Sequence, residues 1–221
     1  MKRKSLCNIV LLLLLSVAAF AKNDSIYCGT TVKLDIASPV IVPAANNWKI
    51  QQYEVAVNVR LTQRYYPTFE LGYAGGSKTR GDSITYSGQG GFFRIGCDIN
   101  PLRKHPESPH AMLIGVRLGS AVQQMEQINE GTSKISGVRG DCWGEIVAGC
   151  QVEIAKVNQT AFYMGWMGRF KCLFTRSYVV KTPANGQEAP RQKIQNAIYI
   201  PGYGKRDNIG WGLSYHLGWR F

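Results

Sequence analysis

The sequence is poor in features that mark several common classes of protein. Beyond the N-terminal region, no apolar run is long enough for a membrane-spanning helix, and no segment has a clear helical periodicity. Five of the six cysteines follow this region, and an odd number excludes a small scaffold in which every cysteine is paired. The histidines His105 and His110 flank a proline-rich turn, a poor basis for a metal site. We therefore predict no metal and no cofactor.

The first 21 residues have the three parts of a secretory signal peptide. A basic stretch, Lys2–Lys4, precedes an apolar run, Ile9–Leu15, and Ala19–Ala21 has the small-x-small pattern of a cleavage site. We predict that residues 1–21 are removed on export and that residues 22–221 form one domain. The whole chain has a formal net charge of +12 and stays basic without this segment, which suits anionic partners such as lipid phosphates.

Alternation of apolar and polar residues dominates the rest of the chain, which indicates half-buried β-strands. Eight segments show it, and eight is the smallest number of strands that closes a membrane barrel. We therefore predict an all-β fold, an eight-stranded antiparallel up-and-down transmembrane β-barrel with a polar lumen filled by side chains. The segments are 31–37, 53–61, 69–74, 93–99, 112–119, 144–154, 162–172 and 209–221.

The connections between these segments differ in length. Those near 63–67 and 156–159 are short, and a proline-rich connection at 100–110 is intermediate. Long external loops and short inner turns are typical of an outer-membrane barrel with both termini in the periplasm. The long connections are 75–91, 122–141 and 175–208.

The pattern leaves two arrangements open. A soluble barrel such as a lipocalin has the apolar face inside and solvated charges outside. The inverted arrangement is favoured by frequent glycine on the polar face, which fits a narrow lumen, and by aromatic residues such as Trp143, Phe174 and Trp211 near the apolar rim. Polar-face charges also come in both signs, so that they can pair inside. The predicted lumen network comprises Lys33, Asp35, Glu54, Arg60, Glu70, Arg94, Asp98, Arg117, Glu145, Glu153, Arg169, Lys171 and Arg220.

The chain ends in an amphipathic segment, 209–221, that we expect to close the barrel against the first strand, because no open sheet edge survives in lipid. Its outward residues Leu217, Trp219 and Phe221 resemble the C-terminal signal by which Gram-negative barrels are recognised for insertion.

Five stretches resemble a Gram-negative family of outer-membrane β-barrels of unknown function, with the architecture of the small OmpA and OmpX barrels. The resemblance implies a fold and an outer-membrane location, and it implies no catalytic residue. Its most specific part, "YIPGYG", is expected to fold back onto the rim. The stretches are "ELGYAG" (70–75), "RIGCDIN" (94–100), "MLIGVRLG" (112–119), "WGEIVAG" (143–149) and "IYIPGYGKRDNIGWGLSYHLGW" (198–219).

We predict a structural or surface-binding role through the external loops. The expected partners are outer-membrane lipid and lipopolysaccharide, the barrel-assembly machinery during insertion, and a surface glycan or protein; no nucleic acid is expected. One alternative is a lipid A acylhydrolase or acyltransferase that uses Ser214 and His216 with an acid from Asp35 or Glu153, although two polar lumen residues are the simpler interpretation. The other alternative is a narrow channel.

Two kinds of covalent modification are suggested by short patterns. If the hairpin is centred on Val157, Cys142 and Cys172 stand opposite each other and form a disulfide; a register centred one residue later leaves them free. Ser25 and Ser83 each lie in an Asp-Ser-Ile triplet that resembles a bacterial O-glycosylation acceptor.

Overall fold

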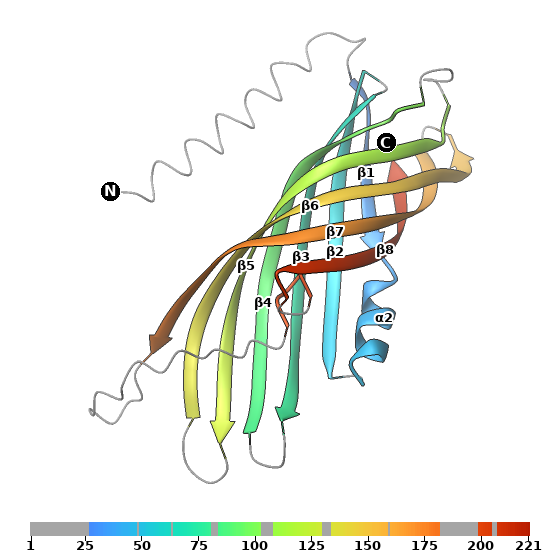
Figure 1. Cartoon of the computed structure of the whole chain (residues 1–221). Coiled ribbons are helices and arrows are strands. Elements are labelled where there is room, and N and C mark those ends of the chain that lie inside the picture. The colour runs from blue at the N-terminus through green and yellow to red at the C-terminus, as the bar shows by residue number, and fades with distance from the viewer. Residues whose placement is uncertain are drawn as a thin grey trace.

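The chain folds into a closed barrel of eight antiparallel strands, and each strand pairs with the next one along the chain (Figure 1). This computed structural model describes residues 27–47, 49–62, 64–80, 84–102, 108–129, 134–158, 160–181, 199–204 and 207–221. The predicted fold class, an eight-stranded up-and-down barrel, is confirmed. The predicted signal peptide, Ser25 and Ser83 lie outside the described residues.

The elements differ in length around the barrel. The three strands β8, β1 and β2 have 9 to 12 residues, whereas β3 to β7 have 16 to 24. In chain order the elements are β1 (Tyr27–Asp35), α2 (Ser38–Ala45), β2 (Ile50–Leu61), β3 (Tyr65–Arg80), β4 (Ile84–Ile99), β5 (Ala111–Asn129), β6 (Lys134–Val157), β7 (Thr160–Lys181) and β8 (Ile209–Arg220).

The two ends of the barrel are therefore unlike. At one end, the turn end, tight connections pass through Thr62 and Asn158, which adopt left-handed conformations with φ of 48° and 54°. At the other, the long-strand end, β3 to β7 continue well beyond the shorter strands (Figure 1). Much of the predicted loops 75–91 and 122–141 is thus β-hairpin, because cross-strand pairing continues as far as Arg80↔Ile84 and Ile128↔Lys134.

The first and last strands close the sheet, as predicted. Leu34 lies opposite Leu217 and Val32 opposite Trp219. The C-terminal Phe221 exchanges backbone hydrogen bonds with Thr30, with N···O distances of 3.0 and 3.3 Å. Closure therefore extends to the last residue, so the final strand leaves no unpaired end at the turn end.

A short helix, α2, was not predicted. The segment "SPVIVPAA" has no charged residue and no apolar stripe of helical period, so its pattern did not indicate a helix. The carboxylate of Asp35 accepts the backbone N–H groups of Ala37 and Ser38 and the Ser38 hydroxyl, which satisfies donors at the helix start. The helix continues the line of β1 and lies beside β2 at the long-strand end (Figure 1). In the part of the chain described, no helix has both the length and the apolar character needed to cross a membrane.

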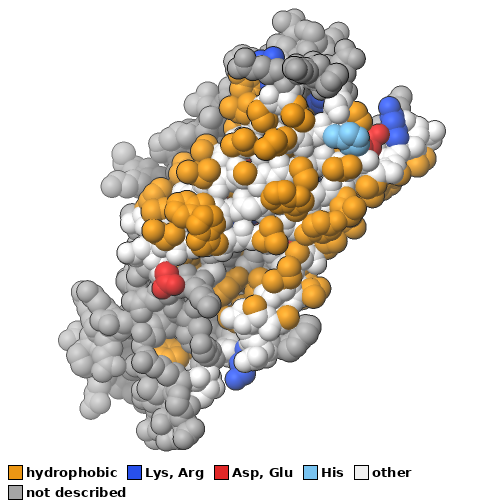
Figure 2. Space-filling model, turned by 45° about the vertical axis from the view of Figure 1, so that its right-hand side comes forward, with side chains coloured by type: hydrophobic (Ala, Val, Ile, Leu, Met, Phe, Trp, Pro, Cys, Tyr) orange, Lys and Arg blue, Asp and Glu red, His pale blue; other side chains and the backbone are white. Residues whose placement is uncertain are grey.

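The barrel is inverted relative to a soluble one. Large apolar side chains on the outer wall, such as Leu71, Val116, Ile146 and Trp211, are exposed, and Trp211 is 78% exposed. Figure 2 shows hydrophobic side chains across the middle of one face, with charged side chains toward its ends. Charged residues that alternate with them along the strands are buried in the lumen. The predicted inside and outside faces are therefore confirmed.

Trp143 is an exception to the predicted outer aromatic residues. It is 1% exposed and its indole N–H donates to Glu145 Oε1 at 2.6 Å. Residues two apart on a strand share a face, so Trp143 lies in the lumen with Glu145, and its predicted place on the apolar rim is wrong. Phe174 and Trp211 are exposed on the outer wall as predicted.

The hairpin register that would permit a disulfide between Cys142 and Cys172 is not found. Cys142 lies opposite Thr175 and Cys172 opposite Gly144, and neither thiol is in a disulfide. The β6–β7 hairpin is centred later than Val157, because Val157 pairs with Thr160, and this register places Cys142 opposite a residue three positions beyond Cys172. No disulfide joins any of the five cysteines among the described residues.

Barrel closure makes a cross-linking prediction. With the native cysteines replaced by alanine, Leu34→Cys combined with Leu217→Cys should form a disulfide on mild oxidation, because these residues are directly opposed and face outward. Mass spectrometry of unreduced peptides measures the bond. The matched pair Leu34→Cys with Leu213→Cys, displaced by four residues, should stay reduced; equal cross-linking of both pairs would contradict this register.

Candidate functional site

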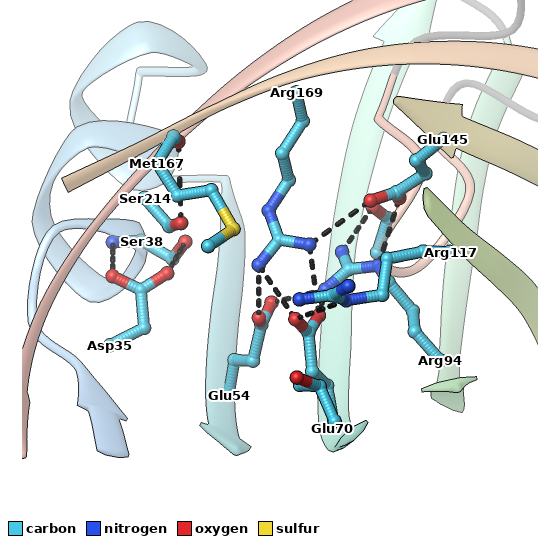
Figure 3. A network of polar contacts seen from close by, with 12 residues as sticks. Asp35, Ser38, Glu54, Glu70, Arg94, Arg117, Glu145, Met167, Arg169 and Ser214 are labelled. Atoms are coloured by element: carbon cyan, nitrogen blue, oxygen red, sulfur yellow. Dashed lines mark hydrogen bonds and ion pairs between the residues drawn. The ribbon is translucent and has the colours of Figure 1, made fainter. Parts of the chain in front are cut away.

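The lumen is filled by a network of buried charges (Figure 3). Three arginines, Arg94, Arg117 and Arg169, project inward from β4, β5 and β7. They meet four carboxylates carried by strands β2, β3, β4 and β6. These are Glu54, Glu70, Asp98 and Glu145.

Arg169 and Arg94 bridge the same three carboxylates. Arg169 lies 3.1 Å from Glu54, 2.9 Å from Glu70 and 3.0 Å from Glu145. The corresponding nitrogen–oxygen distances from Arg94 are 2.8, 2.7 and 2.9 Å. Since the two guanidinium groups and the three carboxylates are all buried, each charge is compensated by partners from different strands, which ties the barrel wall together across the lumen.

Arg117 completes the network on the side of β4. Two of its guanidinium nitrogens bind the two oxygens of Asp98 at 2.6 and 2.7 Å, and its Nε lies 3.2 Å from Glu70. The Arg117 side chain crosses Gly96 on the neighbouring strand, where a Cβ would clash with it and with the Val116 carbonyl. Glycine on the polar face therefore makes room for the arginines, as the sequence pattern suggested.

The other predicted network members lie elsewhere in the lumen. Asp35 binds the start of α2. Arg60 lies over the Tyr66 ring, with its guanidinium carbon 5.9 Å from the ring centre. At the turn end, Glu153 accepts a hydrogen bond from Tyr163 and lies 3.7 Å from Arg220.

The two lysines of the predicted network, Lys33 and Lys171, are also buried in the lumen. Lys33 is buried beside a small cavity that Glu70 and Arg117 also line. Lys171 is buried next to the network, and it donates to backbone carbonyls of a loop rather than to a carboxylate.

That loop, residues 199–204, enters the lumen at the long-strand end and forms a plug. The carbonyl oxygen of Gly202 accepts from Arg94 at 2.6 Å and from Lys171 at 2.8 Å. Ile200 is fully buried, and the buried Tyr203 ring makes an edge-on contact with Trp143 at 5.7 Å between centroids. "YIPGYG" was expected to fold back onto the rim, but it lies deeper, because the network offers N–H donors that its carbonyls satisfy.

The backbone of the plug is shaped by Gly202. Its φ of +74° is in the left-handed region, and a Cβ there would clash with the Phe92 ring. A larger residue would therefore push the carbonyl of Gly202 away from Arg94 and Lys171. The hydroxyl of Tyr199, at the start of the plug, donates a hydrogen bond to Gln52 Oε1, and burial raises the pKa of this hydroxyl above its ordinary value.

A second buried pair was missed by the sequence analysis. Arg139 Nη2 lies 2.7 Å from Asp141, and both residues are 1% exposed, nearer the long-strand end than the main network. They continue the alternation of β6, so the signal was present, but the segment was assigned to a loop.

Asp35, Ser214 and His216 line one small cavity, and Asp35 lies directly opposite His216, but among the described residues no hydrogen bond joins any two of these three candidate catalytic residues. Ser214 and His216 are buried on the lumen face of β8, and the Ser214 hydroxyl donates to the Met167 carbonyl at 3.5 Å. His216 Nε2 is buried with no hydrogen-bond partner among the described residues. Asp35 and Glu153, the two expected acids, bind the start of α2 and the pair of Tyr163 and Arg220, respectively.

The space left inside the lumen is small. A cavity of about 30 Å³ lies between the plug and the wall, and another of about 20 Å³ lies beside Lys33 and His216. Each has room for one or two water molecules. Among the described residues, no group of His, Cys, Asp and Glu is placed to hold a metal ion. The described residues form a closed barrel whose lumen is occupied by paired charges and by its own loop.

The chain belongs to a protein family described as a domain of unknown function (DUF6048), whose model matches residues 2–220. No curated protein matches the sequence. Among solved structures the chain is similar to the crystal structure of a major outer membrane protein from Thermus thermophilus, with 8% identity, a TM-score of 0.40, and coverage of 87% of this chain and 98% of that one. The barrel itself is defined by the strand pairing of this chain.

The network predicts unequal costs for two arginine substitutions. Arg169→Met should destabilise the barrel by about 3–5 kcal/mol, because it leaves buried carboxylates without one of their shared partners. Arg220→Met, which removes a partly exposed contact of 3.7 Å, should cost about 0–1 kcal/mol. Urea unfolding in detergent micelles measures both values, and a near-zero cost for Arg169→Met would mean that the lumen is hydrated.

Proposed function

We propose that this protein is an integral outer-membrane β-barrel of a Gram-negative bacterium. The observation that carries the proposal is the inversion of the barrel, with charges buried in the lumen and large apolar side chains exposed outside. In water this wall would be a contiguous apolar patch, which monomeric soluble proteins rarely expose. In lipid the same wall is the surface that a spanning barrel requires.

The apolar belt has the height that a membrane needs. On β3 it runs from Tyr65 to Tyr73 and on β5 from Met112 to Val122, which is nine and eleven residues. A tilted strand spans the hydrocarbon core with about 9–11 residues. Tyrosines at both edges of the belt on β3 support the same boundaries, because aromatic side chains with a polar tip favour the interface.

The ends of the chain support export and orientation. Residues 1–21 supply the signal peptide, and the outward-facing Leu217, Trp219 and Phe221 supply the signal for the barrel-assembly machinery. Tyr27 and Phe221 both lie at the turn end, which we place in the periplasm. The long-strand end then projects from the cell.

The role we propose is structural or surface-binding, exerted at the projecting end. The charge network and the plug leave no wide pore in the described part of the lumen, and a barrel of this strand number is normally filled by side chains. Lipopolysaccharide and other surface glycans are the partners that this end meets first.

Membrane insertion is tested with refolded protein in phospholipid vesicles. The native chain should migrate differently on gels before and after boiling, as closed barrels do. Ile146→Arg, in the middle of the apolar belt, should lower the free energy of unfolding by about 2–4 kcal/mol, because it places a charge near the bilayer midplane.

Ile154→Arg is the matched control, since Ile154 lies on the same face of β6, nearer the turn end. Its cost should be only about 0–1 kcal/mol. Equal costs at the two positions, or recovery of the native chain in the soluble periplasmic fraction, would contradict a membrane barrel.

The sealed lumen predicts the absence of stepwise conductance in a planar bilayer. We expect no conductance from the native barrel or from a variant in which residues 199–204 are replaced by a glycine-serine segment. In both proteins the arginine network still fills the lumen on the turn-end side of the plug. Steps in the variant alone would assign the seal to the plug. Steps in the native protein would favour the narrow channel instead.

A further inference from the structure

The outer wall changes from apolar to polar just beyond Tyr53 and Tyr73, toward the long-strand end. The strand register aligns an outward row of amide side chains across β2 to β5, interrupted by one glycine. From β2 to β5 this row consists of Gln51, Gly75, Gln89 and Gln124. This row lies next to the two tyrosines. Tyr53 pairs with Tyr73, and the pair Gln51 and Gly75 lies two residues further toward the long-strand end.

The next outward row carries hydroxyls and two charges. Ser77 lies opposite Ser87, and Ser87 lies opposite Glu126, while the backbone N–H of Ser77 donates to the Lys49 carbonyl at the side of β2. The two rows and the two tyrosines line a hollow of about 530 Å³ on the outside of the barrel, which we term the amide groove. Its volume is in the range of small-molecule binding sites.

Gly75 keeps the amide groove open. A Cβ at this position would lie 3.2 Å from Gln89 Cβ, so any side chain would fill the space between Gln51 and Gln89. The tyrosine at the lower edge orients the amide, since the Tyr73 hydroxyl donates to Gln89 Oε1 at 3.0 Å. That bond leaves the amide N–H donors of Gln89 for a ligand.

The residues that line the amide groove indicate the chemical class of its ligand. Three amides and two serine hydroxyls each offer donors and acceptors, which match a ligand rich in hydroxyl groups. Lys49 and Glu126 cancel in charge, so the groove has no excess of positive charge to select a phosphate. The exposed ring of Tyr53 offers an apolar surface with a polar tip, suited to the C–H face of a sugar ring.

The position of the amide groove indicates where its ligand comes from. The groove opens sideways on the outer wall, immediately next to the apolar belt and its tyrosines, where the headgroups of membrane lipids lie. We propose that the amide groove binds the neutral sugar headgroup of a glycolipid in the outer leaflet. This inference rests on the proposed function, because only a membrane-embedded barrel presents the groove to lipid headgroups.

The experiment follows the glutamine side-chain amides by NMR. Full-length mature protein, labelled with ¹⁵N at glutamine, is placed in phosphatidylcholine bicelles, and diglucosyl diacylglycerol is titrated in. The signals of Gln51, Gln89 and Gln124 should shift and saturate. The signal of Gln123, which is buried in the lumen next to Gln124, should stay in place as an internal control.

Substitutions test the groove itself. Gln89→Ala combined with Gln124→Ala should weaken glycolipid binding by about tenfold, the loss expected for two modest hydrogen bonds. Thr79→Ala, an outward change on β3 beyond the groove, should leave the affinity unchanged. A heat-induced gel shift of each variant confirms that it is folded.

Three other outcomes overturn the inference. Saturable shifts with phosphatidylglycerol in place of the glycolipid would show that phosphate is recognised. Equal affinity for free maltose would show that a soluble saccharide is the ligand. If the barrel inserts into bicelles but no glutamine signal responds to glycolipid, the groove is only a solvated wall. Failure of the native chain to insert would instead overturn the proposed function and this inference with it.

Discussion

A buried charge must be paired, and this constraint organises the interior of the barrel. Three arginines and four carboxylates from six different strands lie in one lumen, so each strand must present its charged face inward at a fixed height. Arg169 reaches three acids on β2, β3 and β6, and two of these strands lie far from β7 in the sequence. A shift of any of these strands by one residue would turn its charge onto the apolar outer wall and leave its partners in the lumen unpaired.

The same constraint accounts for the plug. After pairing with the carboxylates, Arg94 still has an N–H group directed to the long-strand end, and the Lys171 ammonium group lies beside it and faces the same loop. The carbonyls of Gly202 and Tyr203 accept these donors. The aromatic and aliphatic side chains of the same loop then cover Trp143, which is itself hydrogen-bonded to Glu145. The loop therefore extends the charge network with backbone acceptors and closes it with an apolar cap.

The sequence predicted the fold and the inward residues well, because strand alternation has a period of two that twelve-residue segments such as β8 reveal without any tertiary information. It did not predict features set by long-range contacts. The plug is held by donors from distant strands. The helix α2 was also missed, although it begins on local hydrogen bonds donated to Asp35, because its segment has no helical pattern. The cysteine register failed for another reason: the β6–β7 turn is centred after Val157, which pairs with Thr160, and the alternation of the two strands does not fix the centre of the turn to the residue.

The two ends of the barrel differ because the strands end at different heights. At the turn end the strands joined by tight turns finish together, with Leu61 opposite Tyr65 and Val157 opposite Thr160, and the contacts of Tyr163 with Glu153 and Arg220 lie at this end. At the other end β8, β1 and β2 stop while β3 to β7 continue, so the sheet would present an open gap beyond the apolar belt. The helix α2 and the plug lie on the short side of this gap, and the amide groove lies where β2 gives way to the longer strands. Because the apolar belt and the charge network fix the rest of the wall, this uneven rim is the part of the barrel where the outward face can be polar, and a binding surface can form there.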